Sequence, residues 1–117
     1  MIALKGYVRN LFEGFEVDEA VEEYILIDIP FKHKNIFGGG GISFNFERCY
    51  IDADLPVSVD NGNIIKARKF LLNNGIIITS EHTHIDTIHY HFDLSLTKEN
   101  IDKIYNLFFN LREKINV

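Results

Sequence analysis

The chain is poor in residue types that define many small protein classes. Its 117 residues include one cysteine, Cys49, two prolines and no tryptophan. A single cysteine excludes an internal disulfide framework and any zinc motif built from several cysteines. Low cysteine use is typical of a reducing compartment, so we expect a cytoplasmic protein. No apolar run approaches the roughly 20 residues that a membrane helix needs, so the sequence predicts no membrane span.

Basic residues are also scarce. Seventeen acidic residues against twelve basic ones give a formal net charge of −5. This balance argues against nucleic acid as a partner, since nucleic-acid binding needs a basic face. It argues equally against binding to an anionic membrane surface. The charge instead favours a basic protein as the partner.

Lys and Arg are absent from residues 10–31, where carboxylates are dense. Acidic blocks steer basic partners, and aromatic side chains often anchor interfaces. The predicted partner-binding residues are Glu13, Glu16, Asp18, Glu19, Glu22, Glu23, Phe12 and Phe15. Asp28 extends the block. The alternative is a solvated acidic face that keeps a small protein in solution.

The remaining composition is that of one globular domain over residues 1–117. Hydrophobic residues make up 46% of the chain, with ten Phe and five Tyr to fill a core. Alternating apolar residues predict strands at 2–9, 23–31, 42–53, 76–83 and 88–96. Helical spacing predicts a middle helix at 64–73 and a C-terminal helix at 98–115. We therefore expect an α+β fold, with an antiparallel sheet of about five strands and both helices packed on one face.

The glycine run Gly38–Gly41 is followed by Ile42 and a predicted strand, and not by Lys-Ser/Thr and a helix. A phosphate-binding loop needs both features, so nucleotide binding is improbable. The run instead predicts a flexible hairpin tip between two strands.

Four of the five histidines lie within ten residues, in the run SEHTHIDTIHYHFDLSL: His82, His84, His89 and His91. If residues 76–83 and 88–96 form a hairpin with Ile85 opposite Ile88, all four share one face. His82 then faces His91, and His84 faces His89. Facing Cβ atoms lie about 4.5–5.5 Å apart, close enough for the imidazoles to bind zinc. The alternatives are a solvated polar face, a pH-sensing patch, and a contact in a homo-oligomer.

In general character this small, acidic α+β chain resembles bacterial immunity and antitoxin proteins. The resemblance is one of physical type and not of any motif. It implies a protein-binding inhibitor that neutralises a basic partner, such as a toxin nuclease, by occluding its active site. We therefore expect a binding protein and not an enzyme. The alternative function is a histidine-ligated metal protein or metal-dependent hydrolase.

Overall fold

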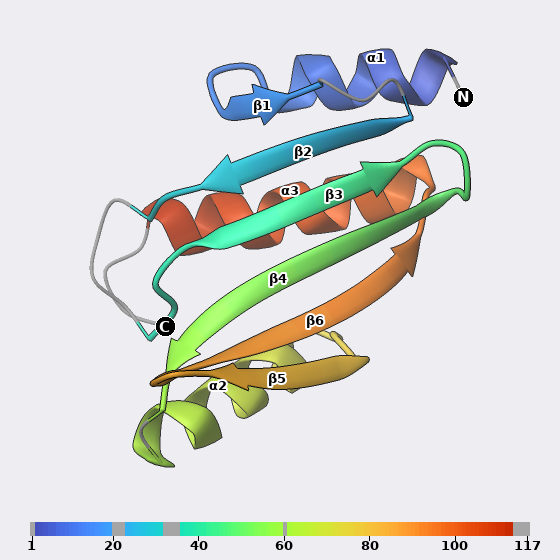
Figure 1. The fold of residues 1–117 in the computed structure, drawn as a ribbon. Coiled ribbons are helices and arrows are strands. Elements are labelled where there is room, and N and C mark those ends of the chain that lie inside the picture. Colours follow the sequence, from blue (N-terminus) through green and yellow to red (C-terminus); the bar gives the residue numbers. More distant parts are fainter. Residues whose placement is uncertain (1, 20–22, 32–35, 60, 114–117) are drawn as a thin grey trace.

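The computed structural model describes residues 2–19, 23–31, 36–59 and 61–113. Within these ranges the chain forms three helices and six strands (Figure 1). In chain order they are α1 (Ile2–Leu11), β1 (Glu16–Asp18), β2 (Tyr24–Ile29), β3 (Gly40–Asn45), β4 (Tyr50–Ser58), α2 (Asn61–Asn73), β5 (Ser80–His84), β6 (Thr87–Ser95) and α3 (Lys98–Glu113). The strands form one antiparallel sheet in the order β1-β2-β3-β4-β6-β5.

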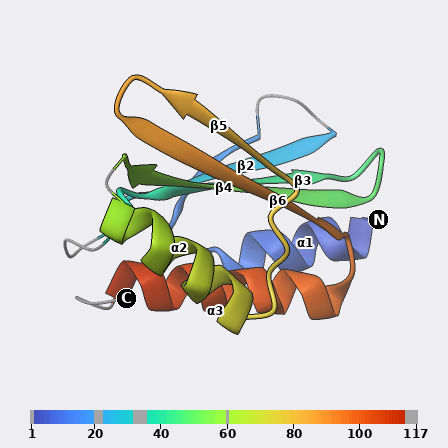
Figure 2. The same ribbon diagram turned by 90° about the horizontal axis from the view of Figure 1, so that it is seen from below.

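The three helices lie on one face of this sheet and leave the other face open (Figure 2). In the central strands, alternate residues therefore face the helices, as do Ile25, Ile27 and Ile29 of β2, each at most 1% exposed. The core between sheet and helices is made of buried aliphatic and aromatic side chains, among them Val8, Phe12, Phe44, Ile51, Leu55, Leu71, Tyr90, Phe92, Ile101, Ile104 and Phe108. No helix in the described ranges is long and apolar enough to cross a membrane.

The α+β class and the antiparallel sheet are confirmed, with six strands where about five were predicted. The middle and C-terminal helices are present as α2 and α3. The strand predicted at 2–9 is wrong, because this segment forms α1. Leu4, Val8 and Leu11 follow helical spacing, and Val8 is fully buried in the core.

The single strand predicted at 42–53 is also wrong, because a turn divides it into β3 and β4. The Asn45 side chain accepts hydrogen bonds from the backbone N–H groups of Glu47 and Arg48, at 3.1 and 2.9 Å. Cys49 then adopts a φ of 60°. Asn side chains stabilise turns through such bonds to the following backbone, so Asn45 ends β3 and reverses the chain.

The predicted glycine hairpin is correct in part: β2 and β3 pair as antiparallel neighbours and Gly38 and Gly39 lie in the connection, but Gly40 and Gly41 belong to β3 and not to the tip. Gly40 faces the helices, where a Cβ would lie 2.2 Å from Cε1 of Phe108 and 3.3 Å from Cδ2 of Leu55. The missing side chain therefore lets α3 pack closely against the sheet. Gly41 faces the open side, where a Cβ would come no closer than 3.9 Å to any atom.

We predict that Gly40→Ala destabilises the fold by about 2 kcal/mol, because the added methyl displaces the buried Phe108 ring. Urea unfolding measures the change. Gly41→Ala is the matched control and should change the free energy of unfolding by less than about 0.5 kcal/mol. Equal losses in the two variants would contradict the close packing of α3 on Gly40.

The β5–β6 hairpin is confirmed, but its predicted register is wrong by two residues. His82 lies opposite His89 and His84 opposite Thr87, while His91 faces Ser80. A connection of only two residues, Ile85 and Asp86, joins the strands. Because the shift is an even number, the histidines keep the side of the sheet that was predicted.

Ile85 adopts a φ of 58° in this connection. The left-handed region costs an L-residue roughly 1–2 kcal/mol, and a β-branched residue is a clear outlier there. The side chain gains nothing from burial, since it is 86% exposed.

We predict that Ile85→Asn stabilises the fold by about 1 kcal/mol, because Asn tolerates a positive φ. Urea unfolding at low protein concentration tests this. Ile77→Asn is the control, since Ile77 is 80% exposed and is not among the residues of positive φ. A similar gain from both substitutions would show that exposure and not backbone strain is responsible.

Candidate acidic face of the sheet

The open face of the sheet carries the polar half of each strand. In the register across the strands, Asp28 lies opposite Gly41, Gly41 opposite Asp54, and Asp54 opposite His91. Glu16 extends this row on β1, where it faces Asp28. Alternation along the strands adds further carboxylates to the same face: Asp18, Asp52 and Asp93. The strand positions described on this face hold six carboxylates and no Lys or Arg.

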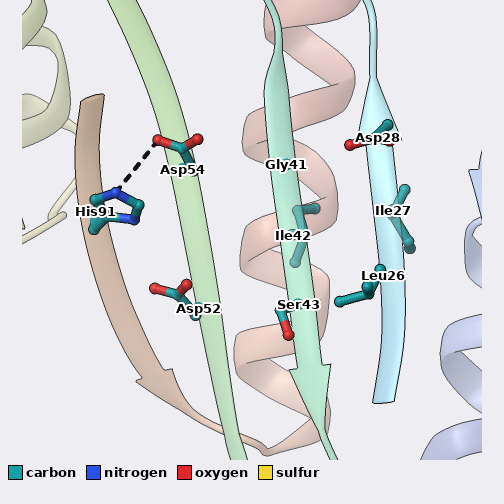
Figure 3. A pocket seen from close by; sticks show the side chains of 9 residues that line it. All are labelled: Leu26, Ile27, Asp28, Gly41, Ile42, Ser43, Asp52, Asp54 and His91. Carbon is teal, nitrogen blue, oxygen red and sulfur yellow. Dashed lines mark ion pairs between the residues drawn. The ribbon is translucent and has the colours of Figure 1, made fainter. Parts of the chain in front are cut away.

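A hollow of about 300 Å³ opens over Gly41 (Figure 3). Its polar lining consists of Asp28, Ser43, Asp52, Asp54 and His91. The missing side chain at Gly41 leaves a gap between the flanking strands, so Asp28 and Asp54 border the gap from opposite sides. The hollow is therefore a negatively charged depression near the middle of the sheet.

Three of the four clustered histidines come together at one side of this hollow. The His82 ring lies parallel to that of His89, with centroids 4.9 Å apart. His91 Nε2 lies 3.2 Å from His82 Nδ1. Asp54 contacts two of the rings, with 3.2 Å to His89 Nδ1 and 3.8 Å to His91 Nε2. One carboxylate thus holds the β6 histidines beside the acidic row.

The fourth histidine, His84, is exposed at the turn end of the hairpin, opposite Thr87. Among the residues that the structure describes, no three His, Cys, Asp or Glu side chains are arranged so that they could hold a metal ion. The zinc site predicted from His82, His84, His89 and His91 therefore gains no geometric support. What the sequence predicted correctly is the common face of these residues.

Asp52 and Asp93 face each other on neighbouring strands. Burial of Asp52, together with a hydrogen bond and charge repulsion from Asp93, raises the pKa of Asp52 to about 6. A carboxyl group beside a second carboxyl group retains its proton to higher pH, because both cannot ionise without repulsion. The open face thus holds a pair of acids that disfavours its fully charged form.

This pair makes stability depend on pH. In the folded chain the pKa of Asp52 is about 6, whereas the ordinary pKa of an aspartate, expected in the unfolded chain, is 3.8. The unfolded chain then binds fewer protons between these pH values, so stability falls as pH rises through them. We predict that Asp52→Asn removes this loss and gains about 1 kcal/mol at pH 7, after allowance for solvent screening.

Thermal or urea unfolding from pH 4 to pH 8 measures this dependence. Glu47→Gln is the control, because Glu47 is an exposed carboxylate in the turn between β3 and β4. It should leave the pH profile unchanged. An Asp52→Asn profile parallel to that of the wild type would contradict the assignment to this pair.

The acidic block of residues 10–31 is divided by the fold. Glu16, Asp18 and Asp28 reach the open face. Glu19 pairs with Arg9 at 2.6 Å, next to α1. Glu13 and Glu23 are exposed outside the strands, and Glu22 lies outside the described residues.

The two predicted aromatic anchors are placed in or against the core. Phe12 is 1% exposed and packs edge-to-face on Phe44 and Tyr105, with centroids 5.6 and 5.2 Å away. Phe15 is half-buried against Phe12, and the Arg112 guanidinium lies 4.2 Å from its ring centroid. A buried ring cannot enter a partner, so Phe12 is corrected from a contact residue to a core residue.

Asp52, Asp54 and Asp93 are not among the acidic residues that were predicted to bind a partner. The signal was present, since each alternates with buried residues of β4 or β6. What was missing was the order of the strands, because β4 pairs with β6 and not with β5.

Comparison with protein-family models, with curated proteins and with solved structures finds no significant match to the chain.

Proposed function

We propose that this protein binds a basic protein partner through the open face of its sheet and inhibits it, in the manner of immunity and antitoxin proteins. The observation that carries the proposal is the charge of that face: six carboxylates on described strand positions, without a Lys or Arg among them. A surface whose charges all have the same sign attracts an oppositely charged surface and raises the rate at which the two proteins associate.

The face also offers contacts beyond charge. Leu26 is 43% exposed beside the hollow, and Tyr24 and Tyr50 lie half-buried on the same side of the sheet. Aromatic and apolar side chains supply much of the affinity of protein interfaces, while charges supply specificity and rate. The combination suits a protein surface better than a small anion or a lone cation.

Inhibition is the part of the proposal that depends on the partner. Enzymes that act on nucleic acids carry basic active sites, because their substrate is a polyanion. An acidic sheet that covers such a site excludes the substrate, because its carboxylates pair with the basic side chains that would otherwise bind the nucleic-acid phosphates. We therefore infer a toxin nuclease as the class of partner that this face fits.

The partner can be sought by affinity capture from cells that make the protein, followed by titration of the retained protein. We predict that a triple variant with Glu16, Asp28 and Asp93 changed to Lys weakens this binding by at least roughly 100-fold. These residues are exposed and lie on three different strands. Higher salt should weaken wild-type binding and have much less effect on the variant.

A second triple variant, with Glu47, Asp86 and Glu99 changed to Lys, is the control. It makes the same change in net charge, but at exposed sites outside the strands of the open face. Its affinity should stay within about threefold of the wild type. Equal losses of affinity in both variants would show that net charge alone determines binding. No loss of affinity in either variant would exclude the open face as the docking surface.

A further inference from the structure

The two edges of the sheet differ in how they are protected. At one edge, β1 has three residues, with Glu16 and Asp18 at its ends. Charged residues and short length keep an edge strand from pairing with another chain. At the other edge, β5 runs from Ser80 to His84, and all five residues are exposed.

The free edge of β5 has no strong barrier to pairing. It contains no Pro, Lys or Asp, and its one acidic residue, Glu81, is paired with Arg68 of α2 at 3.0 Å. The two-residue connection makes His84 and Thr87 the last hydrogen-bonded pair of the hairpin. Hydrogen-bonded and non-hydrogen-bonded pairs alternate along an antiparallel pair of strands. The backbone N–H and C=O groups of Glu81 and Thr83 therefore point away from β6, toward the free edge.

Exposed isoleucines stand at both ends of this edge. Ile77, just before β5, is 80% exposed, and Ile85, just after it, is 86% exposed. They are the most exposed large hydrophobic side chains in the described chain. Position 85 is an isoleucine although its φ of 58° would suit Gly or Asn better.

We infer that two copies of this chain pair their β5 strands about a two-fold axis and form one continuous twelve-stranded sheet, twice the six strands of each copy. A two-fold interface requires a surface that is complementary to itself. An antiparallel pair centred on His82 meets this requirement. Glu81 of each copy then faces Thr83 of the other, which avoids a direct contact between like charges.

The same arrangement accounts for the isoleucines. In an antiparallel pair, the end of one strand meets the beginning of the other. Ile85 of each copy falls opposite Thr79 of its partner copy, so it becomes a diagonal neighbour of the partner copy's Ile77 on the same side of the strand. Contact between the two side chains then shields both from water. The interface uses the edge of the sheet and not its face, so it stands apart from the proposed docking of a basic partner.

The test is the mass of the untagged full chain in solution, measured by sedimentation and by light scattering over a wide range of concentration. We expect a concentration-dependent change from 13.6 kDa to twice that mass. Amide hydrogen exchange should slow at Glu81 and Thr83 as concentration rises. A chain that stays monomeric at its highest attainable concentration would overturn the inference.

Two variants identify the edge. Thr83→Pro removes an outward N–H and should raise the dissociation constant of the dimer at least about tenfold, whereas Thr83→Val keeps the N–H and should leave the dimer in place. A double variant, Ile77→Lys with Ile85→Lys, changes only exposed side chains and should also give a monomer. A dimer of unchanged affinity in both the proline and the lysine variants would place the interface elsewhere and overturn the assignment to β5.

Discussion

Burial of the sheet on one side only is the constraint on which the other features depend. All three helices of the described chain pack on the same face (Figure 2). Strand side chains alternate between faces, so the central strands must supply apolar residues at every second position, while the other positions can be polar. In β4 the alternation is complete, with Ile51, Ala53, Leu55 and Val57 buried. The free positions of that strand include Asp52 and Asp54.

The open face gains charge at a cost to the fold. Like charges directly opposite each other on neighbouring strands are destabilising, and the register places Glu16 opposite Asp28 and Asp52 opposite Asp93. Nothing in the packing of the core requires acids at these positions. The repulsion is tolerated because the helical side supplies a continuous apolar core. Residues that oppose folding without a structural benefit are expected at sites of function.

The sequence predicted the elements whose periodicity admits one interpretation. β6 alternates strictly, and α3 repeats Ile101, Ile104 and Phe108 at helical spacing. The N-terminal segment failed because Leu4 and Val8 are four apart, a spacing that fits both a strand and a helix. Strand order failed for a different reason: the pairing of β4 with β6 depends on contacts between distant segments. Local pattern does not encode such contacts, so Asp52 and Asp54 could not be joined to the histidines in advance.

The histidine cluster shows which part of a site prediction is robust. A hairpin register depends on the length of its turn, and the connection through Ile85 and Asp86 moved every facing pair by two residues. The face survived, because an even shift preserves side-chain parity. Metal coordination needs particular facing pairs, whereas a charged surface needs only the common face. The common face, on which a charged docking surface depends, is unaffected by the register error, whereas the facing pairs predicted for zinc, His82 with His91 and His84 with His89, are replaced by other pairs.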